Sequence, residues 1–299
     1  MEKRVIALGF FDGVHLGHAE LIKKAKERAG SIGARPAVLT FDRHPDSLVS
    51  GKEVELISSP EDRAELIRRY FGVEDIISLR FDEGMMKMPW DKFVEWLAGD
   101  LGAVGFVAGH DFRFGWKGEG DTEKLKSKSA EAGLCCDIIP RVELDGVTVS
   151  STYIRSLLKA GDVETAARFL GHPHTLTDSV RFGYRLGSKL GTPTINMRFE
   201  QGVLAPAYGV YAARVTIDGE SLRRFAVTNV GVRPTVSGEG TVSVESYILD
   251  YDGNLYGKRV RLEFMRFMRP ERRFENVDAL KEQIFRDRKE TEKYFGIEK

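Results

Sequence analysis

The first 140 residues alternate between short apolar runs and longer amphipathic segments. Five runs rich in Val, Ile, Leu and Phe are predicted to be strands, at residues 4–10, 35–41, 74–81, 103–109 and 134–140. Between the first two, a segment that ends at Gly30 repeats apolar residues at helical spacing, at Leu21, Ile22, Ala25 and Ala29. Pro60 and Pro89 open two further helices. Strands that alternate with helices predict βαβ units and a parallel sheet.

The pattern changes after Ser150. Two short helices are predicted over 151–161 and 162–171, each ending at a glycine. Short alternating strands with Gly, Asp and Pro turns then follow, at 209–218, 223–232, 241–250 and 258–267, and a last helix covers 277–295. Such strands predict an antiparallel barrel or sandwich. Because 299 residues exceed the usual size of one core, we predict two domains, residues 1–172 and 173–299.

Composition narrows the class of protein. Hydrophobic residues at 42% and charged residues at 30% are typical of a globular chain. The 45 basic and 45 acidic residues give no basic field, so we expect small-molecule substrates and no nucleic acid partner. No apolar stretch is long enough for a membrane span and the chain opens as a strand, so we expect a cytoplasmic protein without a membrane partner. The oligomeric state stays open.

The only cysteines, Cys135 and Cys136, are adjacent in a predicted strand. Neighbouring side chains of a strand point to opposite faces, which is poor geometry for a disulfide. We therefore expect both to be reduced structural residues.

The segment GFFDGVHLGH, residues 9–18, links the first strand to the first helix. Ligands of open α/β sheets bind at such strand ends. The glycines let the backbone approach a phosphate, and the helix N-terminus attracts anions. His15 and His18 can both face one anion there, although a turn cap and an ordinary helix-start residue would look the same.

This segment resembles the signature of the HxGH nucleotidyltransferases, in the G-x-F-D-G-V-H-x-G-H form of bacterial FAD synthetases. The segments TFDRHP, GHDFRFG and VSSTYIR, at residues 40–45, 109–115 and 149–155, fit the same family in the expected order. Phe10 stands where many of these proteins have asparagine, and Lys117 where relatives often have arginine, so neither is given a role.

The resemblance implies a Rossmann-like domain that adenylylates FMN with ATP, giving FAD and pyrophosphate. It implies a catalytic role for His15 and His18, and ATP binding by Gly9, Phe11, Asp12, Gly13, Ser151, Thr152 and Arg155. It places the flavin against Asp111, Phe112, Arg113 and Phe114. The hydroxyl residues could instead be a helix cap beside a solvated arginine, and the two phenylalanines could be core.

Residues 183–196, GYRLGSKLGTPTIN, place a glycine at every fourth position before Pro-Thr-Ile-Asn. Such a backbone can wrap phosphates, although a flexible hairpin would have the same composition, and the pattern is not a Walker A motif. Thr194 and Asn196 alternate on one strand face. Their neutral oxygens suit a Mg²⁺ ion that also keeps waters and phosphates.

This stretch resembles the riboflavin kinase signature G-x-x-x-G-x-x-x-G-x-P-T-x-N, with Thr192 and Ile195 where phenylalanine and alanine are common. Three later segments fit as well, at 227–235, 244–258 and 268–274. The resemblance implies a riboflavin kinase-like antiparallel β-barrel with a terminal helix, which phosphorylates riboflavin to FMN. It implies ATP binding by Gly183, Gly187, Lys189, Gly191, Pro193 and Asn229, and metal binding by Thr194 and Asn196.

The same resemblance makes Glu245 the general base for the riboflavin hydroxyl. It also suggests that Arg269 and Glu271 order a loop over the flavin, although an exposed ion pair is an equal reading. The chain is thus identified as a member of the bacterial bifunctional riboflavin kinase/FMN adenylyltransferase family, using ATP with Mg²⁺. Three alternatives stay open: another HxGH transferase, an enzyme with one active half, and a regulator that binds flavin or nucleotide without turnover.

Overall fold

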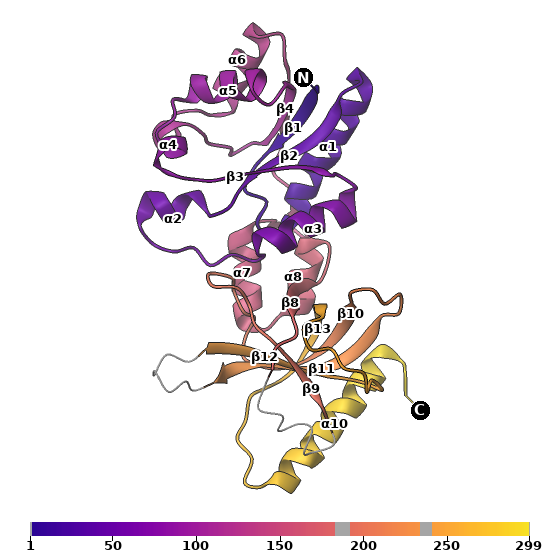
Figure 1. Ribbon diagram of the computed structural model, residues 1–299. Helices are drawn as coiled ribbons and strands as arrows, with labels where there is room; N and C mark the ends of the chain where they lie inside the picture. Colours follow the sequence, from indigo (N-terminus) through magenta and orange to yellow (C-terminus); the bar gives the residue numbers. More distant parts are fainter. Residues whose placement is uncertain (1, 183–191, 234–240, 299) are drawn as a thin grey trace. The chain divides into compact units, whose positions relative to one another are not determined.

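The computed structural model describes residues 2–182, 192–233 and 241–298 (Figure 1). The chain divides into two compact units, Met1–Ser151 and Thr152–Lys299. This division assigns the two helices after Ser150 to the second unit. The predicted domain boundary after residue 172 stays a prediction.

The first unit contains a five-stranded sheet in which every neighbouring pair is parallel. Its order is β3-β2-β1-β4-β5, with bounds Asp75–Leu79, Arg35–Phe41, Arg4–Leu8, Ala103–Gly109 and Cys135–Ile139. A small antiparallel pair, β6 (Glu143–Leu144) and β7 (Val147–Thr148), follows. The five predicted strands and the parallel sheet are confirmed. Cys135 and Cys136 are free and half-buried.

Alternate residues of β1 point into two separate hydrophobic cores. Val5 and Ala7 pack with helices α1 (Leu16–Ile32) and α3 (Pro60–Phe71). Ile6 and Leu8 pack with α5 (Trp90–Gly99) and α6 (Thr122–Glu131) on the other face. Short helices complete the unit: η1 (Asp12–Val14), α2 (Pro45–Ser50), α4 (Glu83–Met86) and η2 (Trp116–Gly118). Both faces of the sheet are therefore covered, as parallel sheets require.

The predicted first helix is confirmed with a different end. Gly30 lies inside α1, and the helix ends at Gly33, whose φ of 64° suits glycine and whose N–H binds the Ala29 carbonyl. Strand order reverses around β1, between β2 on one side and β4 on the other. Ligands of such sheets bind at this reversal, at the carboxyl ends of the strands.

The second unit begins with α7 (Ser151–Ala160) and α8 (Val163–Leu170), followed by a six-stranded antiparallel sheet. The sheet order is β8-β13-β10-β11-β12-β9, with bounds His174–Ser179, Arg259–Pro270, Gly209–Ile217, Arg224–Arg233, Thr241–Ile248 and Thr194–Met197. An antiparallel bridge between Arg181 and Asn196 links the chain just after β8 to the opposite edge strand, β9. The predicted antiparallel barrel with its terminal helix α10 (Val277–Phe295) is confirmed (Figure 1).

Within the part of the chain that the structure describes, none of the helices has both the length and the hydrophobicity to cross a membrane.

Candidate active sites

A cavity of about 540 Å³ lies in the first unit, at the carboxyl ends of β1, β4 and β5. Its walls come from residues after β1, the start of α1, the loop that follows β4 and the segment leading to α7. Seven of the residues predicted from the sequence line it: Gly9, His15, His18, Asp111, Phe112, Arg113 and Ser151. The fold thus brings segments more than 100 residues apart to one cavity.

His15 and His18 form a stacked pair at the start of α1. Their ring centroids are 3.6 Å apart with an interplanar angle of 13°. His15 caps the helix, because its Nδ1 accepts a hydrogen bond from the His18 backbone N–H at 3.3 Å. Burial lowers the pKa of His18 well below its usual value, and the charges of His15 and Arg63 lower it further. The site therefore favours a neutral imidazole at His18.

Gly17 allows this stacking. A Cβ atom at Gly17 would lie 3.1 Å from Cε1 of His15 and 3.2 Å from its Nδ1. Such contacts are tighter than most real ones, so a side chain would force the His15 ring to shift by a few tenths of an ångström. The glycine between the two histidines thus lets the His15 ring keep its stacked position.

The turn before the histidines contains Phe11, Asp12 and Gly13. These three residues are not among those that line the cavity. Phe11 is buried with a left-handed φ of 59°, a strained conformation for an aromatic residue. The buried Asp12 carboxylate accepts hydrogen bonds from the backbone N–H of Ile57 at 2.8 Å and of Ser58 at 3.2 Å. These contacts hold the turn, and any ATP contact from it would come from the backbone.

The predicted flavin residues divide between surface and core. The side chains of Asp111 and Arg113 are largely exposed. Phe112 lines the cavity and stacks on Phe114 at 5.4 Å. Phe114 is 7% exposed and packs on Phe93 in the core. Phe114 therefore supports the Phe112 ring that lines the cavity.

Ser151 lies at the end of the first unit, and its Oγ donates to the Asp12 carbonyl at 3.3 Å. Thr152 and Arg155 follow in α7, which the division of the chain assigns to the second unit. Their predicted contact with ATP phosphates stays a prediction.

Arg63 is a residue of this region that the sequence pattern does not single out. It lies in the first turn of α3 and is 1% exposed. Its guanidinium lies 4.1 Å from the centroid of the Phe10 ring. An arginine in an amphipathic helix is usually exposed, so the sequence gives no sign that Arg63 is buried. Only the tertiary structure shows its burial.

The second candidate site is a row of side chains across the barrel sheet. Glu245 of β12 lies opposite Asn196 of β9 and opposite Asn229 of β11. Val210 of β10 continues the row, with Asn229 on one side and Arg269 of β13 on the other. Directly opposed residues of antiparallel strands share one face. Strand register therefore brings together four polar residues that lie far apart in the sequence.

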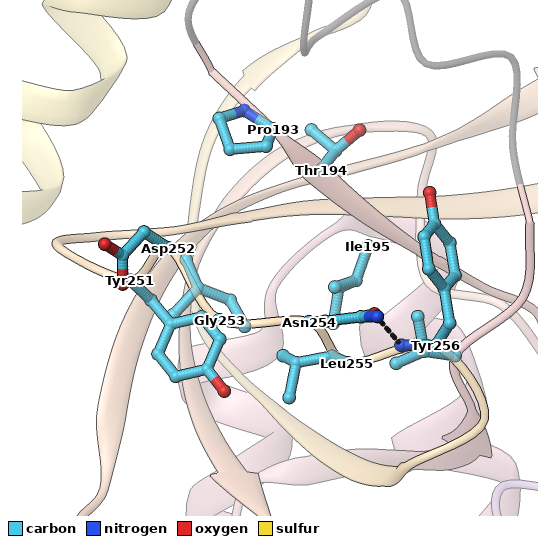
Figure 2. A pocket seen from close by; sticks show the side chains of 11 residues that line it. Pro193, Thr194, Ile195, Tyr251, Asp252, Gly253, Asn254, Leu255 and Tyr256 are labelled. Atoms are coloured by element: carbon cyan, nitrogen blue, oxygen red, sulfur yellow. Dashed lines mark hydrogen bonds between the residues drawn. The ribbon is translucent and has the colours of Figure 1, made fainter.

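Two cavities share Thr194. One of about 300 Å³ is lined by Glu245, Asn229 and Thr192 together with residues of the β13–α10 connection and of α10, namely Arg269, Glu271, Arg272, Phe274, Leu280, Ile284 and Asp287. The other, of about 350 Å³, lies between the segment 193–195 and the turn 251–256 (Figure 2). Tyr256 of that turn stacks on Phe182 at 4.2 Å, and Phe182 is 76% exposed.

Four predicted ATP-binding residues, Gly183, Gly187, Lys189 and Gly191, lie outside the described residues. Pro193 is described and lines the larger of the two barrel cavities.

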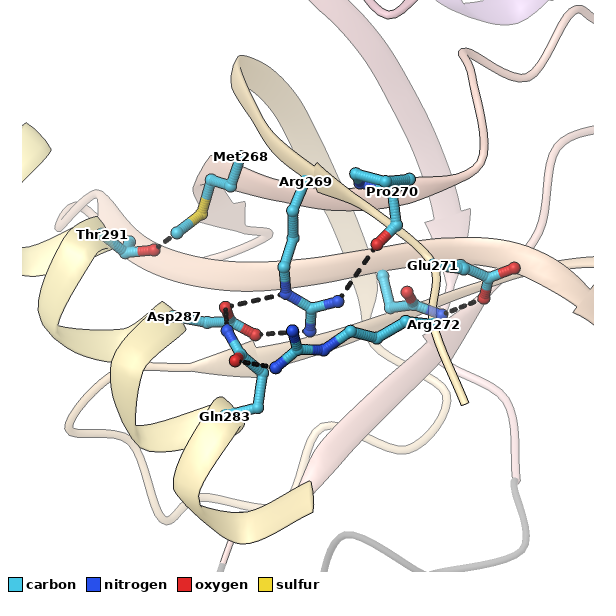
Figure 3. Close-up of polar contacts among 9 residues, drawn as sticks. Met268, Arg269, Pro270, Glu271, Arg272, Gln283, Asp287 and Thr291 are labelled. Atoms are coloured by element: carbon cyan, nitrogen blue, oxygen red, sulfur yellow. Dashed lines mark hydrogen bonds and ion pairs between the residues drawn. The ribbon is translucent and has the colours of Figure 1, made fainter. Parts of the chain in front are cut away.

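A polar network ties the segment after β13 to α10 (Figure 3). Arg269 binds the Asp287 carboxylate through two hydrogen bonds of 3.0 and 2.7 Å. Gln283 donates to Asp287 at 2.6 Å and accepts a hydrogen bond from Arg272. These contacts hold α10 against the 300 Å³ cavity. Gln283 and Asp287 of α10 belong to no motif that the sequence singles out.

The Glu271 carboxylate lies against β11. The Asn229 side-chain amide donates to its carboxylate at 2.9 Å. A Cβ atom at Gly231 would overlap that carboxylate, so the glycine makes room for it. The expected link between Arg269 and Glu271 is thus indirect, because Arg269 pairs with Asp287 and Glu271 binds Asn229.

Comparisons with known proteins agree with this arrangement. The family model described as FAD synthetase matches residues 1–153, and the one described as riboflavin kinase matches residues 170–295. A bifunctional riboflavin kinase/FMN adenylyltransferase of Listeria monocytogenes is 35% identical over 98% of this chain and 93% of its own length. The protein of the same description from Bacillus subtilis is 34% identical over 98% and 93%.

A solved structure described as a macrolide-efflux protein from Streptococcus pneumoniae has a TM-score of 0.85. It is 29% identical, and the match covers 97% of this chain and 94% of that one. Its description differs from those of the sequence relatives. The structural match includes residues of both units. The two matched domains and the nearly full-length relatives show that the chain belongs to the bifunctional riboflavin kinase/FMN adenylyltransferase family.

Proposed function

We propose that the chain converts riboflavin to FMN in its C-terminal half and FMN to FAD in its N-terminal half, with ATP as the donor in both steps. The observation that carries the proposal is the presence of two separate polar sites, one in each family domain. The stacked histidines line a cavity in the first unit. Glu245 lies in a cross-strand row in the second.

In the N-terminal site the FMN phosphate oxygen attacks the α-phosphorus of ATP, and pyrophosphate leaves. The step requires no protein nucleophile, so the protein contributes positioning and charge stabilisation. The start of α1 would offer backbone N–H groups to the phosphates. His15 and His18 would donate hydrogen bonds to the same oxygens. The exposed loop with Asp111 and Arg113 would hold the flavin side.

In the C-terminal site Glu245 would take the proton from the riboflavin 5′-hydroxyl as its oxygen attacks the γ-phosphorus of ATP, with ADP leaving. Glu245 lines the 300 Å³ cavity, whose apolar wall includes Phe274, Leu280 and Ile284. That wall suits a flavin ring. The 350 Å³ cavity, with Tyr256 and the stacked Phe182, suits a purine nucleotide. Because both cavities include Thr194, the two substrates would meet there.

Mg²⁺ is expected to accompany ATP in the barrel. Within the described ranges, no group of three or more His, Cys, Asp or Glu residues could hold a metal ion. The Thr194 hydroxyl and the Asn196 amide oxygen fit a hard cation that keeps waters and phosphate oxygens. A bound Mg²⁺ would screen the phosphate charges. Location in the cytoplasm and the lack of a nucleic acid partner stay predictions.

The test is to incubate the purified protein with riboflavin, ATP and Mg²⁺ and to follow the flavins by chromatography. FMN should form first and then convert to FAD. His18→Ala should abolish FAD formation and spare FMN formation, whereas Glu245→Ala should abolish FMN formation and spare FAD formation from added FMN. Loss of both activities in one folded variant would contradict separate sites. Flavin binding without turnover in the unaltered protein would favour the regulator.

A further inference from the structure

Arg63 joins two strand ends that border the histidine cavity. Its Nη1 donates to the Phe10 carbonyl at 3.0 Å, to the Thr40 hydroxyl at 2.7 Å and to the Phe41 carbonyl at 2.9 Å. Phe10 follows β1, and Phe41 ends β2. Phe10 also lines the cavity. The guanidinium therefore fixes the backbone where the phosphate-binding turn begins.

The other edge of the same guanidinium is not satisfied by hydrogen bonds within the described part of the chain. Nε and Nη2 of Arg63 are buried without a hydrogen bond, and the carboxylates of Asp12 and Asp42 act on the guanidinium only through their charge. The same edge in Arg28 and in Arg269 holds a carboxylate through two hydrogen bonds. Arginine is almost never fully buried without a partner, because such burial costs free energy. A purely structural arginine would be expected to have this edge satisfied.

The charge of Arg63 acts on the histidine pair. Burial lowers the pKa of Arg63 to about 10, against the opposing effect of Asp12 and Asp42, so the group stays charged at neutral pH. That charge contributes to the lowered pKa of His18. The guanidinium thus raises the local electrostatic potential next to the predicted phosphate cradle.

We propose that Arg63 is a positioning residue of the adenylyl-transfer site, where its fixed charge and strand-end hydrogen bonds prepare the cradle for the ATP triphosphate. The inference rests on the proposed function. ATP and FMN together bring two polyanions into one cavity, and a preorganised charge in a low-dielectric setting offsets their repulsion without reorganisation. The guanidinium acts through the turn and through the field, and it need not touch the substrate.

The first test measures KM for ATP and kcat in FAD formation from added FMN. Arg63→Met removes the charge with similar bulk and should raise KM about tenfold, which corresponds to about 1.4 kcal/mol of binding free energy. Arg68→Met, which removes an exposed arginine of the same helix, is the matched control and should leave both constants unchanged. A folded Arg63→Met enzyme with an unchanged KM would overturn the proposal.

The second test still decides if Arg63→Met does not fold. Burial lowers the pKa of a lysine ammonium, whereas a guanidinium stays charged. In Arg63→Lys, KM for ATP relative to the unaltered enzyme should rise about tenfold between pH 7 and pH 9 as the ammonium loses its proton. The lowered pKa of His18 in α1 keeps its imidazole neutral between pH 7 and pH 9, and Asp12 of η1 and Asp42 after β2 are present in both enzymes.

A ratio that stays constant with pH would show that Arg63 has only a structural role and would overturn the inference. An unaltered enzyme that forms no FAD would instead refute the proposed function, so the two failures are distinguishable.

Discussion

His174 begins β8 inside the barrel unit and is 1% exposed. Its ring lies 5.9 Å from the ring of Phe199 and 5.7 Å from that of Phe264, measured between centroids. Burial lowers its pKa from 6.5 to about 3, the charge of His172 acts in the same direction, and a backbone hydrogen bond with Leu204 opposes both. The folded protein therefore holds this imidazole neutral.

The sign of the pH effect follows from the lowered pKa. As the pH falls below 6.5, the unfolded chain binds a proton at His174 before the folded chain does. The stabilisation is complete above pH 6.5 and is lost as the pH falls toward 3. The full difference corresponds to about 5 kcal/mol, and the share lost by pH 5 is about 2 kcal/mol. That share is a large part of the usual stability of a domain.

The assay is urea unfolding at pH 8 and pH 5 for the unaltered protein and for His174→Phe. Eight of the nine tyrosines lie in the second unit and all three tryptophans in the first, so tyrosine circular dichroism and tryptophan fluorescence report the units separately. His174→Phe should reduce the pH dependence of the barrel transition by about 2 kcal/mol. Ile248→Val, the control, shortens a buried apolar side chain of β12 and should lower stability equally at both pH values. An unchanged pH dependence in His174→Phe would refute the reasoning.

Three further substitutions test packing and charge at named sites. Gly17→Ala should lower FAD formation by about tenfold to a hundredfold with FMN formation intact, because the new methyl group displaces the His15 ring; equal rates in flavin chromatography would contradict this. Asp287→Ala should destabilise the barrel unit by about 3 kcal/mol, measured by tyrosine circular dichroism in urea, because it leaves the Arg269 guanidinium unpaired. Gly30→Ala should stabilise the first unit by about 1 kcal/mol in tryptophan-monitored unfolding, because it lies inside α1 with nothing within 4 Å of the added methyl.

Elements with a strong local pattern could be predicted from the sequence. The five strands of the parallel sheet are runs of Val, Ile and Leu, and the last helix has the predicted bounds of Val277–Phe295. Helix α6 was missed, because its sequence TEKLKSKSAE buries only Leu125 and Ser129 and so shows no apolar stripe. Strand β8, HTLTDS, was missed because too few of its residues are typical of strands.

The two sites differ in how far the sequence could predict them. The phosphate cradle is one contiguous segment between a strand and a helix, so its residues could be assigned from the chain alone. Residues that come from elsewhere in the chain could not, as Arg63 shows. In α10 the buried polar residues Gln283, Asp287 and Thr291 recur every four positions. Helical spacing shows that these three residues share a face. It does not show that Arg269 and Arg272 bind the polar groups on that face.

The barrel site depends on register, which sequence periodicity leaves open. Alternation places Thr194 and Asn196 on one face of β9, but a shift of one residue in the pairing with β12 would put Glu245 on the other face. The observed register opposes Asn196, Glu245 and Asn229 on neighbouring strands, so the proposed metal ligands and the proposed base share a surface only when three strands pair correctly. Any change that shifts this register should therefore abolish FMN formation completely, whereas the His15 and His18 pair is set by a local turn and does not depend on the register of paired strands. FMN formation should for this reason depend more strongly than FAD formation on the correct pairing of strands.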